Sequence, residues 1–317
     1  MLENFIFSVN AVIPLFVVMA VGYIIRVLGW TDSSMNRRMN ALVFNLGLPV
    51  LLFRDVSRSN IIEHLFDIPF VMLSFAATIV VFVLSWKLSM PYFKSRKVAG
   101  TFAQACFRSN YAIVGLPLTA FVLGDSDSGL ALLPVAFIVP LYNVLTSIAL
   151  AGNEGESLLG LRGMLTLVRN IFSPLMYGIL LGLAVSLADI SLPVVVDIPI
   201  DYIAMMTTPM ALLALGGSID ISKMRSRYKP ALVVAFVKLV LSPLIFVPIA
   251  VWLGFGSEAV LVMFVMLATP TAISSYAFAC NLGGDEDLAL NGILFTMAFA
   301  VFTLTLGLFT LRTFGLL

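Results

Sequence analysis

Charged side chains are scarce in this sequence of 317 residues, of which only 11% are Asp, Glu, Lys or Arg and 61% are hydrophobic. The mean hydropathy of +1.07 excludes a soluble globular protein and predicts a polytopic membrane protein. The formal net charge is only +1, and no basic surface suited to nucleic acid is evident. The lipid bilayer is therefore the expected surrounding of most of the chain.

Cysteine and histidine are also rare, with two Cys and one His in the whole sequence. Cys106 and Cys280 lie in apolar segments, cannot build a disulfide framework, and are expected to be small buried residues. The sequence contains no phosphate-binding loop, no metal-ligand cluster and no nucleophile arrangement. We therefore expect neither a cofactor nor enzymatic activity, and the lack of a signalling domain argues against a receptor.

Long apolar runs, by contrast, occupy most of the sequence. Runs of about 20 apolar residues cross a bilayer as helices, because a helix satisfies its own backbone in lipid. Hydropathy and turn signals predict ten spans, at about 5–28, 36–55, 68–92, 98–124, 129–150, 165–188, 199–220, 229–253, 258–282 and 288–313.

The basic residues are distributed unevenly between the two sides of these spans. With the N-terminus outside, the outer side carries only Arg54, Arg58 and Arg312. The cytoplasmic side then carries thirteen: Arg26, Arg37, Arg38, Lys87, Lys94, Arg96, Lys97, Arg162, Arg169, Lys223, Arg225, Arg227 and Lys229. Such a bias predicts that both termini lie on the outer side.

The two halves of the sequence repeat. Asn10-x3-Pro14-Leu15 with Gly22 recurs 160 residues later as Asn170-x3-Pro174-Leu175 with Gly182. Further matches in the same order pair Pro49 with Pro209, Pro69 with Pro230, Pro117 with Pro270, and Leu130-Ala131-Leu132 with Leu288-Ala289-Leu290. We predict a five-helix repeat at 1–150, a cytoplasmic connector at 151–164 and a second repeat at 165–317. Because five is odd, the second repeat is inverted in the membrane.

Two of the predicted spans are interrupted. Residues 98–124 contain Arg108-Ser109-Asn110 and then Gly115-Leu116-Pro117, where we expect the break, and residues 258–282 are broken at Thr269-Pro270-Thr271. Proline removes a backbone donor, and the freed groups need a protected polar environment. Discontinuous helices at corresponding places of inverted repeats indicate the substrate site of a secondary transporter, where helices 4 and 9 cross. The alternative is that both prolines only kink packed helices.

Several residues near the breaks can contact an anionic guest. Half-helices present N–H groups and a positive dipole end, so we expect donors at Leu118, Thr119, Thr271 and Ala272. Asn110 lies two turns before Pro117, Ser274 and Ser275 follow Pro270, and Asn143 lies in the fifth span. For these polar side chains the alternative is a hydrogen bond between neighbouring helices.

Arg108 and Lys238 are cationic residues within predicted spans, and a charged residue in such a position usually indicates a functional site. Asp and Glu fall only at span ends or in loops, so each cation either binds an anionic substrate or donates to backbone carbonyls that a break has freed. Arg108 can alternatively be wholly structural, and Lys238 can exchange a proton.

These motifs are similar to those of the auxin efflux carrier family, whose bacterial members include malate and malonate permeases. The resemblance rests on Leu48-Pro49-x2-Leu52-Phe53, Arg108-Ser109-Asn110 with Gly115-Leu116-Pro117, Pro140-Leu141-Tyr142-Asn143-Val144-Leu145, Pro209-x2-Leu212-Leu213-Ala214-Leu215-Gly216-Gly217-Ser218, and Lys238-Leu239 with Pro243. It implies a ten-helix, sodium/proton antiporter-like architecture with a scaffold part and a mobile part, a homodimer and a bacterial inner membrane. Bacterial members often have Thr-Gly where this chain has Tyr111-Ala112, and Asn where it has Ser274.

The sequence thus predicts a secondary carrier of a small organic anion of the carboxylate class. The candidate substrate-binding residues are Arg108, Ser109, Asn110, Gly115, Pro117, Asn143, Lys238, Pro270, Thr271, Ser274 and Ser275. An exchanger or symporter coupled to cations or protons is the alternative. Sodium coupling stays open, because backbone carbonyls with Asn and Ser oxygens can bind sodium without a carboxylate.

Overall fold

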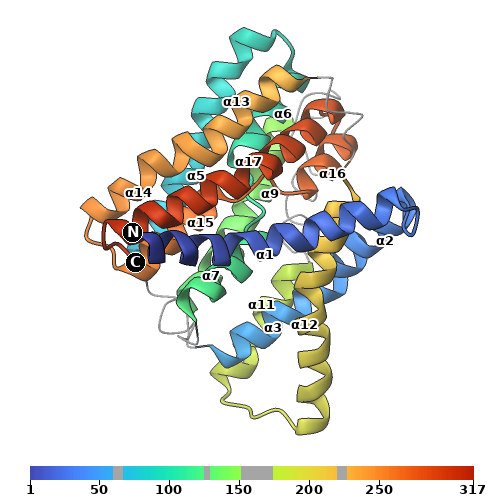
Figure 1. Cartoon of the computed structure of the whole chain (residues 1–317), viewed down its shortest axis with the longest axis vertical. Helices are drawn as coiled ribbons and strands as arrows, with labels where there is room; N and C mark the ends of the chain where they lie inside the picture. The colour runs from blue at the N-terminus through green and yellow to red at the C-terminus, as the bar shows by residue number, and fades with distance from the viewer. Residues whose placement is uncertain (60–66, 125–128, 151–173, 220–226) are drawn as a thin grey trace, which may run out of the picture.

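The computed structural model describes residues 1–59, 67–124, 129–150, 174–219 and 227–317, and these are helical throughout apart from short connections and one isolated bridge (Figure 1). The predicted connector 151–164, the first residues of the predicted sixth span with Asn170, and Lys223 and Arg225 lie outside the described residues. The helices are α1 (Leu2–Val27), α2 (Ser33–Leu42), α3 (Leu48–Arg58), α5 (Ile68–Phe93), α6 (Arg96–Phe107), α7 (Leu116–Leu123), α8 (Gly129–Leu133), α9 (Val139–Leu150), α11 (Pro174–Leu187), α12 (Val194–Gly217), α13 (Tyr228–Phe236), α14 (Ser242–Trp252), α15 (Ser257–Ala268), α16 (Ser274–Asn281) and α17 (Glu286–Thr313).

Within the described part, seven helical stretches are long and apolar enough to cross a membrane. They are Leu2–Val27, Ser33–Arg58, Ile68–Phe93, Gly129–Leu150, Val194–Gly217, Tyr228–Trp252 and Glu286–Thr313. The remaining predicted spans, 98–124, 165–188 and 258–282, contain the shorter apolar helices Tyr111–Leu123, Pro174–Leu187 and Ser257–Ala268. The chain is therefore an integral membrane protein built from helices.

Four prolines of the described residues share one local geometry. Pro49, Pro117, Pro140 and Pro243 each lie two residues after a π-helical turn, namely η1 (Val43–Gly47), η2 (Tyr111–Gly115), η3 (Pro134–Ile138) and η5 (Val237–Leu241). A wider turn makes room for the proline ring and for the carbonyl that has lost its donor. The helix consequently continues through Pro117, and the break expected at Gly115-Leu116-Pro117 is wrong. The chain leaves helical geometry earlier, at Arg108-Ser109-Asn110.

Several of the described helices approach each other at glycines, and two of these contacts are related by the repeat. Gly22 of α1 faces the carbonyl of Leu213 in α12, and Gly182 of α11 faces the carbonyl of Phe53 in α3 so closely that an added Cβ would lie 2.8 Å from it. Small residues at such contacts let helix backbones approach in membranes. Gly182 lies 160 residues after Gly22, and Leu213 lies 160 residues after Phe53. The glycine of each half therefore contacts, in the other half, the position that corresponds across the repeat.

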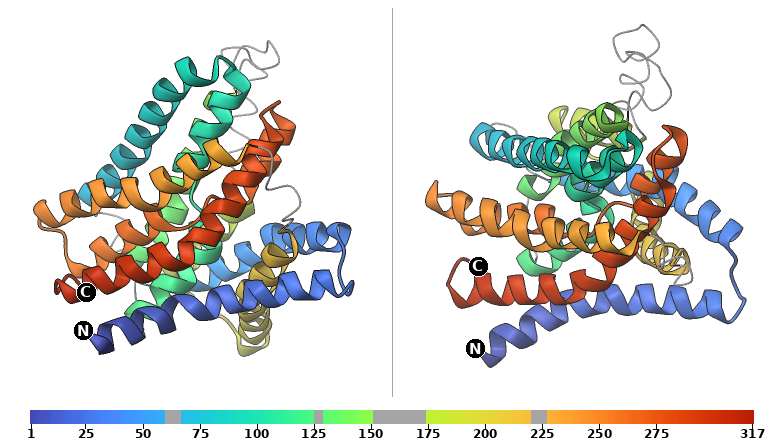
Figure 2. Two further views of the ribbon diagram at one scale, coloured as in Figure 1. Left: turned by 45° about the horizontal axis from the view of Figure 1, so that its top comes forward. Right: turned by 90° about the horizontal axis from the view of Figure 1, so that it is seen from above.

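The helices α5, α6, α9 and α13 to α17 lie on one side of the molecule, and α2, α3, α11 and α12 lie on the other, with α1 running across both (Figures 1 and 2). The N- and C-termini lie side by side. Ion pairs join connections that the sequence assigns to one membrane side: Arg58 with Asp197 at 2.7 Å on the outer side, and Arg227 with Asp285 at 3.0 Å on the cytoplasmic side.

Candidate functional site

The site begins where two broken helical segments meet. α6 ends at Phe107 and helix resumes at Tyr111, while α15 ends at Ala268 and α16 starts at Ser274. The two extended stretches pair in antiparallel fashion: the Asn110 N–H donates to the Pro270 carbonyl at 2.8 Å, and the Ala272 N–H donates to the Arg108 carbonyl at 3.1 Å. Each break thereby satisfies backbone groups of the other, which is how irregular backbone is tolerated at membrane depth.

The backbone donors expected past the prolines are not available to a guest. The Thr271 N–H donates to the Thr296 hydroxyl at 3.1 Å and the Ala272 N–H is used within the pairing. Leu118 and Thr119 are fully buried inside the continuous part of the helix. The expectation was wrong because it placed the first break at Pro117. In the first turn of the helix beginning at Ser274, the N–H groups of Ser275 and Tyr276 donate to the carbonyls of Ala272 and Ile273. What this helix and the one beginning at Tyr111 offer an anion is therefore mainly the positive end of the helix dipole.

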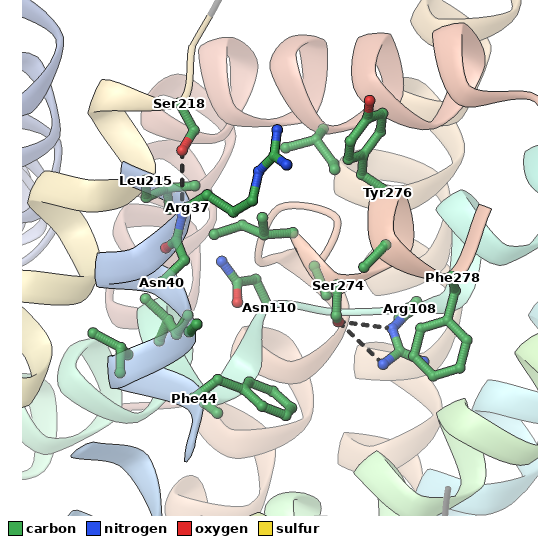
Figure 3. A pocket seen from close by; sticks show the side chains of 18 of the residues that line it. Arg37, Asn40, Phe44, Arg108, Asn110, Leu215, Ser218, Ser274, Tyr276 and Phe278 are labelled. Carbon is green, nitrogen blue, oxygen red and sulfur yellow. Dashed lines mark hydrogen bonds between the residues drawn. The ribbon is translucent and has the colours of Figure 1, made fainter. Parts of the chain in front are cut away.

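A cavity of about 750 Å³ lies against these breaks (Figure 3). Its inner end is formed by residues 108–110 and 272–274, and its mouth by the ends of α1, α12 and α16 with the beginning of α2. Between them the wall is largely apolar, with Phe44, Leu48, Ile113, Ile293 and Met297 among its residues. The site therefore combines a polar inner end with apolar walls, as small-molecule sites usually do.

Arg108 forms part of the polar end. It is only 4% exposed, and its guanidinium donates to Asn143 Oδ1 at 2.8 Å, to Thr146 Oγ1 at 3.2 Å and to Ser274 Oγ at 3.1 Å. The same group lies over the ring of Phe278, 4.4 Å from its centre. All of these partners are neutral, and no described carboxylate forms an ion pair with Arg108. The cavity wall thus carries a buried positive charge. Within the described chain this charge is balanced only by the dipoles of neutral groups and not by a negative charge.

Asn110 lies beside it with an unused donor. The side chain is 5% exposed and lines the cavity, and its Nδ2 has no hydrogen-bond partner among the residues that the structure describes. In Figure 3 the amide points into the space that Arg37 and Ser274 also face. A buried donor without a partner costs roughly 1–3 kcal/mol, so a guest with an acceptor oxygen at this position would relieve that cost.

The structure brings some of the predicted site residues to the cavity and not others. Arg108, Ser109, Asn110, Asn143 and Ser274 line it. The residues that do not line it are Gly115, Pro117, Lys238, Pro270, Thr271 and Ser275.

The residues away from the cavity have packing roles instead. The Thr271 hydroxyl donates to the Ala105 carbonyl at 2.7 Å, and the Ser275 carbonyl accepts from Gln104. Gly115 leaves room for the ring of Tyr111, which an added Cβ would meet. Lys238 does not line the cavity. It donates to the Leu267 carbonyl at 2.8 Å, which is the backbone contact among its predicted roles.

Sequence reasoning missed the residues at the mouth. Arg37, Asn40, Ser218 and Tyr276 line the cavity (Figure 3), and Asn40 donates to Ser218 Oγ at 3.2 Å. The sequence predicts Arg37 only as a cytoplasmic charge, and nothing in its neighbours 36–40 indicates a cavity. Cys280 was expected to be buried, but it is exposed and lines the cavity, because α16 turns this face toward the opening and not toward the core.

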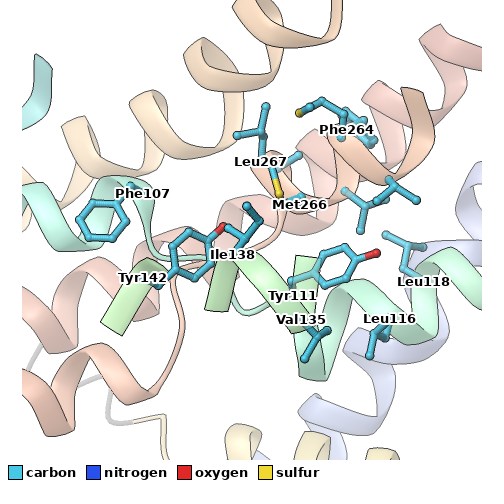
Figure 4. Packing of buried hydrophobic residues seen from close by; sticks show 14 of the residues in the cluster. Phe107, Tyr111, Leu116, Leu118, Val135, Ile138, Tyr142, Phe264, Met266 and Leu267 are labelled. Atoms are coloured by element: carbon cyan, nitrogen blue, oxygen red, sulfur yellow. The ribbon is translucent and has the colours of Figure 1, made fainter. Parts of the chain in front are cut away.

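Beyond the breaks, toward Gly124, the chain is closely packed. Tyr111, Leu116, Leu118 and Ile138 are buried together with Phe264 (Figure 4), and the Tyr111 hydroxyl donates to the Ala131 carbonyl at 2.9 Å. A bulky apolar layer of this kind excludes water. The cavity therefore opens toward one side of the crossing and is sealed toward the other.

The chain is similar in sequence to several membrane transport proteins. The sequence profile of a family described as "Membrane transport protein" matches residues 7–151 and 153–308. A Rhizobium meliloti protein named "Putative malonate transporter" is 26% identical over 311 residues, which cover 95% of each chain. An "Uncharacterized transporter" of Methanothermobacter thermautotrophicus is 22% identical and covers 95% of this chain and 98% of its own. The "Uncharacterized transporter YfdV" of Escherichia coli is 23% identical and covers 90% of this chain and 93% of its own.

Proposed function

Because the chain belongs to the membrane transport protein family, the auxin efflux carrier family, we propose that it is a secondary carrier of a small organic anion of the carboxylate class. The anion binds in the cavity beside the crossing of the two broken segments, and transport proceeds by alternating access across the cell membrane. We further propose that this is a bacterial inner membrane, with both termini on the outer side.

The observation that carries the proposal is the charge at the inner end of the cavity. Arg108 is buried and contacts only neutral groups among the described residues, and the Asn110 Nδ2 next to it has no partner. A cation inside a membrane protein that faces a cavity usually meets an ion or a substrate. A carboxylate has acceptor oxygens only, so it complements both the guanidinium and the amide.

The helix ends at the same place favour the same sign of charge. α16 begins at Ser274 and the helix that contains α7 begins at Tyr111, so two N-terminal first turns lie at the crossing. The positive end of a helix dipole attracts anions. Half-helices aimed at an anionic substrate are a general feature of carriers built from inverted repeats.

We propose that the helices form ten spans arranged as two inverted repeats of five. The exchanged contacts of Gly22 with Leu213 and of Gly182 with Phe53 support this arrangement, as does the antiparallel pairing of the two breaks. The side-by-side termini are also consistent with an even number of crossings (Figure 1).

The state described is then open to the cytoplasm. Arg26, Arg37 and Cys280 lie at the mouth of the cavity, on the side that the distribution of basic residues assigns to the cytoplasm. The packed layer around Tyr111 and Leu118 closes the outer side. In the opposite state this layer opens and the mouth closes.

The size and lining of the cavity guide the choice of substrates. A volume of about 750 Å³ with mostly apolar walls exceeds what a compact dicarboxylate fills. A carboxylate with an apolar body would place its charge at Arg108 and its body against Phe44 and Met297. The relative named for malonate makes compact dicarboxylates the second group to test.

Uptake into proteoliposomes tests the function directly. Radiolabelled aromatic monocarboxylates, aliphatic monocarboxylates and malonate are offered to the wild type, to Arg108→Gln and to Arg38→Gln. Arg38 is exposed and does not line the cavity, so its variant controls for the loss of a charge. We expect saturable uptake of at least one carboxylate by the wild type and the control, and none by Arg108→Gln.

Two results would contradict the proposal. One is wild-type uptake of none of the carboxylates together with electrogenic sodium or proton flux, which would favour an ion exchanger of the same architecture. The other is undiminished uptake by Arg108→Gln, which would remove the proposed site even if the protein transports the anion.

A further inference from the structure

Lys238 is a second buried cation, and the substrate cavity does not use it. It lies in the π-turn η5, is 1% exposed, and its Nζ donates to the carbonyls of Leu267 at 2.8 Å and Met266 at 3.4 Å. Both carbonyls belong to the last turn of α15, which ends at Ala268 immediately before the break. No described carboxylate forms an ion pair with this ammonium group.

The end of α15 is a place that attracts a cation. The last carbonyls of a helix have no intrahelical donor and carry the negative end of its dipole. In carriers built from broken helices, such C-terminal ends and unwound carbonyls coordinate the coupling sodium ion. Figure 4 shows Met266 and Leu267, which belong to this end of the helix.

The surroundings of Lys238 resemble an alkali-cation site that is already filled. Thr78 and Ser242, whose side chains carry hydroxyls, line the same small space together with Cys106. Carbonyl and hydroxyl oxygens are the ligands that hard cations prefer. The space beside the lysine does not admit a water molecule, and the ammonium group would repel a second cation there.

The corresponding end of α6 is satisfied differently. There the carbonyl of Ala105 accepts from the neutral hydroxyl of Thr271 at 2.7 Å, and the carbonyl of Gln104 accepts from the Arg108 N–H at 3.0 Å. Among the described residues, a cationic side chain donates to the end of α15, which leads to Ser274 and the substrate cavity, and none donates to the end of α6.

We propose that the Lys238 ammonium group takes the place of a coupling cation at the end of α15, so that transport of the anion does not require sodium. The lysine acts as a positioning residue, since it touches the backbone that sets the break and not the substrate. The part of this inference that concerns transport rests on the proposed function. The part that concerns a cation site does not, because binding of a cation can be measured without a substrate.

The experiment combines uptake and thermal unfolding of the full-length protein. Wild type, Lys238→Ala, Lys238→Gln and the control Lys229→Gln, an exposed lysine at the start of α13, are compared in sodium, choline and methylammonium chloride at equal ionic strength. We expect the wild type and the control to transport equally in sodium and in choline. Lys238→Ala should lose at least tenfold in choline and recover severalfold in sodium or methylammonium.

The thermal arm needs no substrate. The melting temperature of Lys238→Ala should rise with sodium or methylammonium, whereas that of the wild type should not respond. Lys238→Gln, which keeps a donor but no charge and fills most of the space, should be inactive in every salt.

Three results would overturn the inference: a tenfold loss of wild-type uptake when choline replaces sodium, full activity of Lys238→Gln in choline, or a Lys238→Ala protein that no cation stabilises or reactivates. If the wild type transports no carboxylate, the proposed function fails, and the melting temperatures still decide whether the site accepts a cation. If Lys238→Ala does not fold, the wild type alone decides: equal uptake in sodium and in choline supports the inference, and a tenfold loss in choline overturns it.

Discussion

The main-chain N–H of Asn110 donates a hydrogen bond of 2.8 Å to the carbonyl of Pro270, and the two residues are 160 positions apart in the sequence. Both lie in stretches that have left helical geometry and would otherwise expose backbone groups within the membrane. This bond and its neighbour from Ala272 to Arg108 fix the relative position of the two breaks. The side chains of Arg108, Asn110 and Ser274 are presented to the cavity from this rigid point.

Asn110→Ala is expected to weaken substrate binding with little effect on folding. The Nδ2 has no partner to lose within the described protein. A hydrogen bond to a charged acceptor contributes roughly 1.5–3 kcal/mol, so KM for uptake should rise about 10- to 100-fold. The measurement is the concentration dependence of uptake, with Asn45→Ala as control, since Asn45 is exposed and bonds only to the Ala41 carbonyl. An unchanged KM in Asn110→Ala would show that the amide does not meet the substrate.

Arg37→Gln is expected to reduce affinity more mildly. Arg37 lines the mouth of the cavity and is exposed, so water and salt screen its attraction for an anion. Exposed charge pairs contribute ~0.2–1 kcal/mol, which corresponds to a rise of KM of roughly 1.4- to 5-fold. The effect should vanish at high ionic strength, because a Debye length of about 3 Å at 1 M salt leaves little attraction. A loss that persists in 1 M salt would instead place Arg37 in direct contact with the substrate.

Gly22→Ala and Gly182→Ala are expected to destabilise the packing of α1 on α12 and of α11 on α3. An added Cβ would collide with the Leu213 carbonyl in the first case and lie 2.8 Å from the Phe53 carbonyl in the second. Overpacking of this kind costs typically ~1–3 kcal/mol, visible as a lower melting temperature in detergent. Gly256→Ala is the matched control, because a Cβ there meets no atom within 4 Å. Equal melting temperatures for all three variants would contradict the close approach of these helices.

Cys280 should react with a hydrophilic maleimide while Cys106 should not. Cys280 is exposed on the cavity wall and Cys106 is fully buried. In vesicles of known orientation the reagent should label the protein only from the cytoplasmic side, and a transported carboxylate should slow the labelling. Cys280→Ser, which removes the reactive thiol, should abolish the signal. Labelling from the outer side alone would reverse the proposed orientation of the cavity.

Much of the fold follows from the sequence because the membrane imposes simple rules. A long apolar run must be helical in lipid, so the helices at Leu2–Val27, Ile68–Phe93 and Glu286–Thr313 lie close to the predicted spans 5–28, 68–92 and 288–313. The importance of residues 98–124 and 258–282 was also visible, because polar residues and proline are unusual inside such runs. Ten spans and inverted repeats stay predictions, and their first test is the exchanged glycine contacts.

The position of the first break could not be read from the sequence. Proline predicts a break at Pro117, yet a π-turn accommodates this residue and the chain leaves helical geometry at Arg108-Ser109-Asn110. Whether a helix breaks depends on which groups can satisfy its freed backbone. In this case the partner is Pro270 with Ala272, from the other half of the chain.

The sequence alone determined that this protein is embedded in a membrane and which two segments are interrupted. Hydropathy and proline placement are local properties, and lipid requires apolar helices whose backbone groups are paired. Only the tertiary structure decided that Arg108 and Asn110 face the cavity while Lys238 faces the end of α15. A side chain's direction and partners depend on how distant helices pack. Where a helix carries polar residues on several faces, periodicity does not reveal which face meets the cavity.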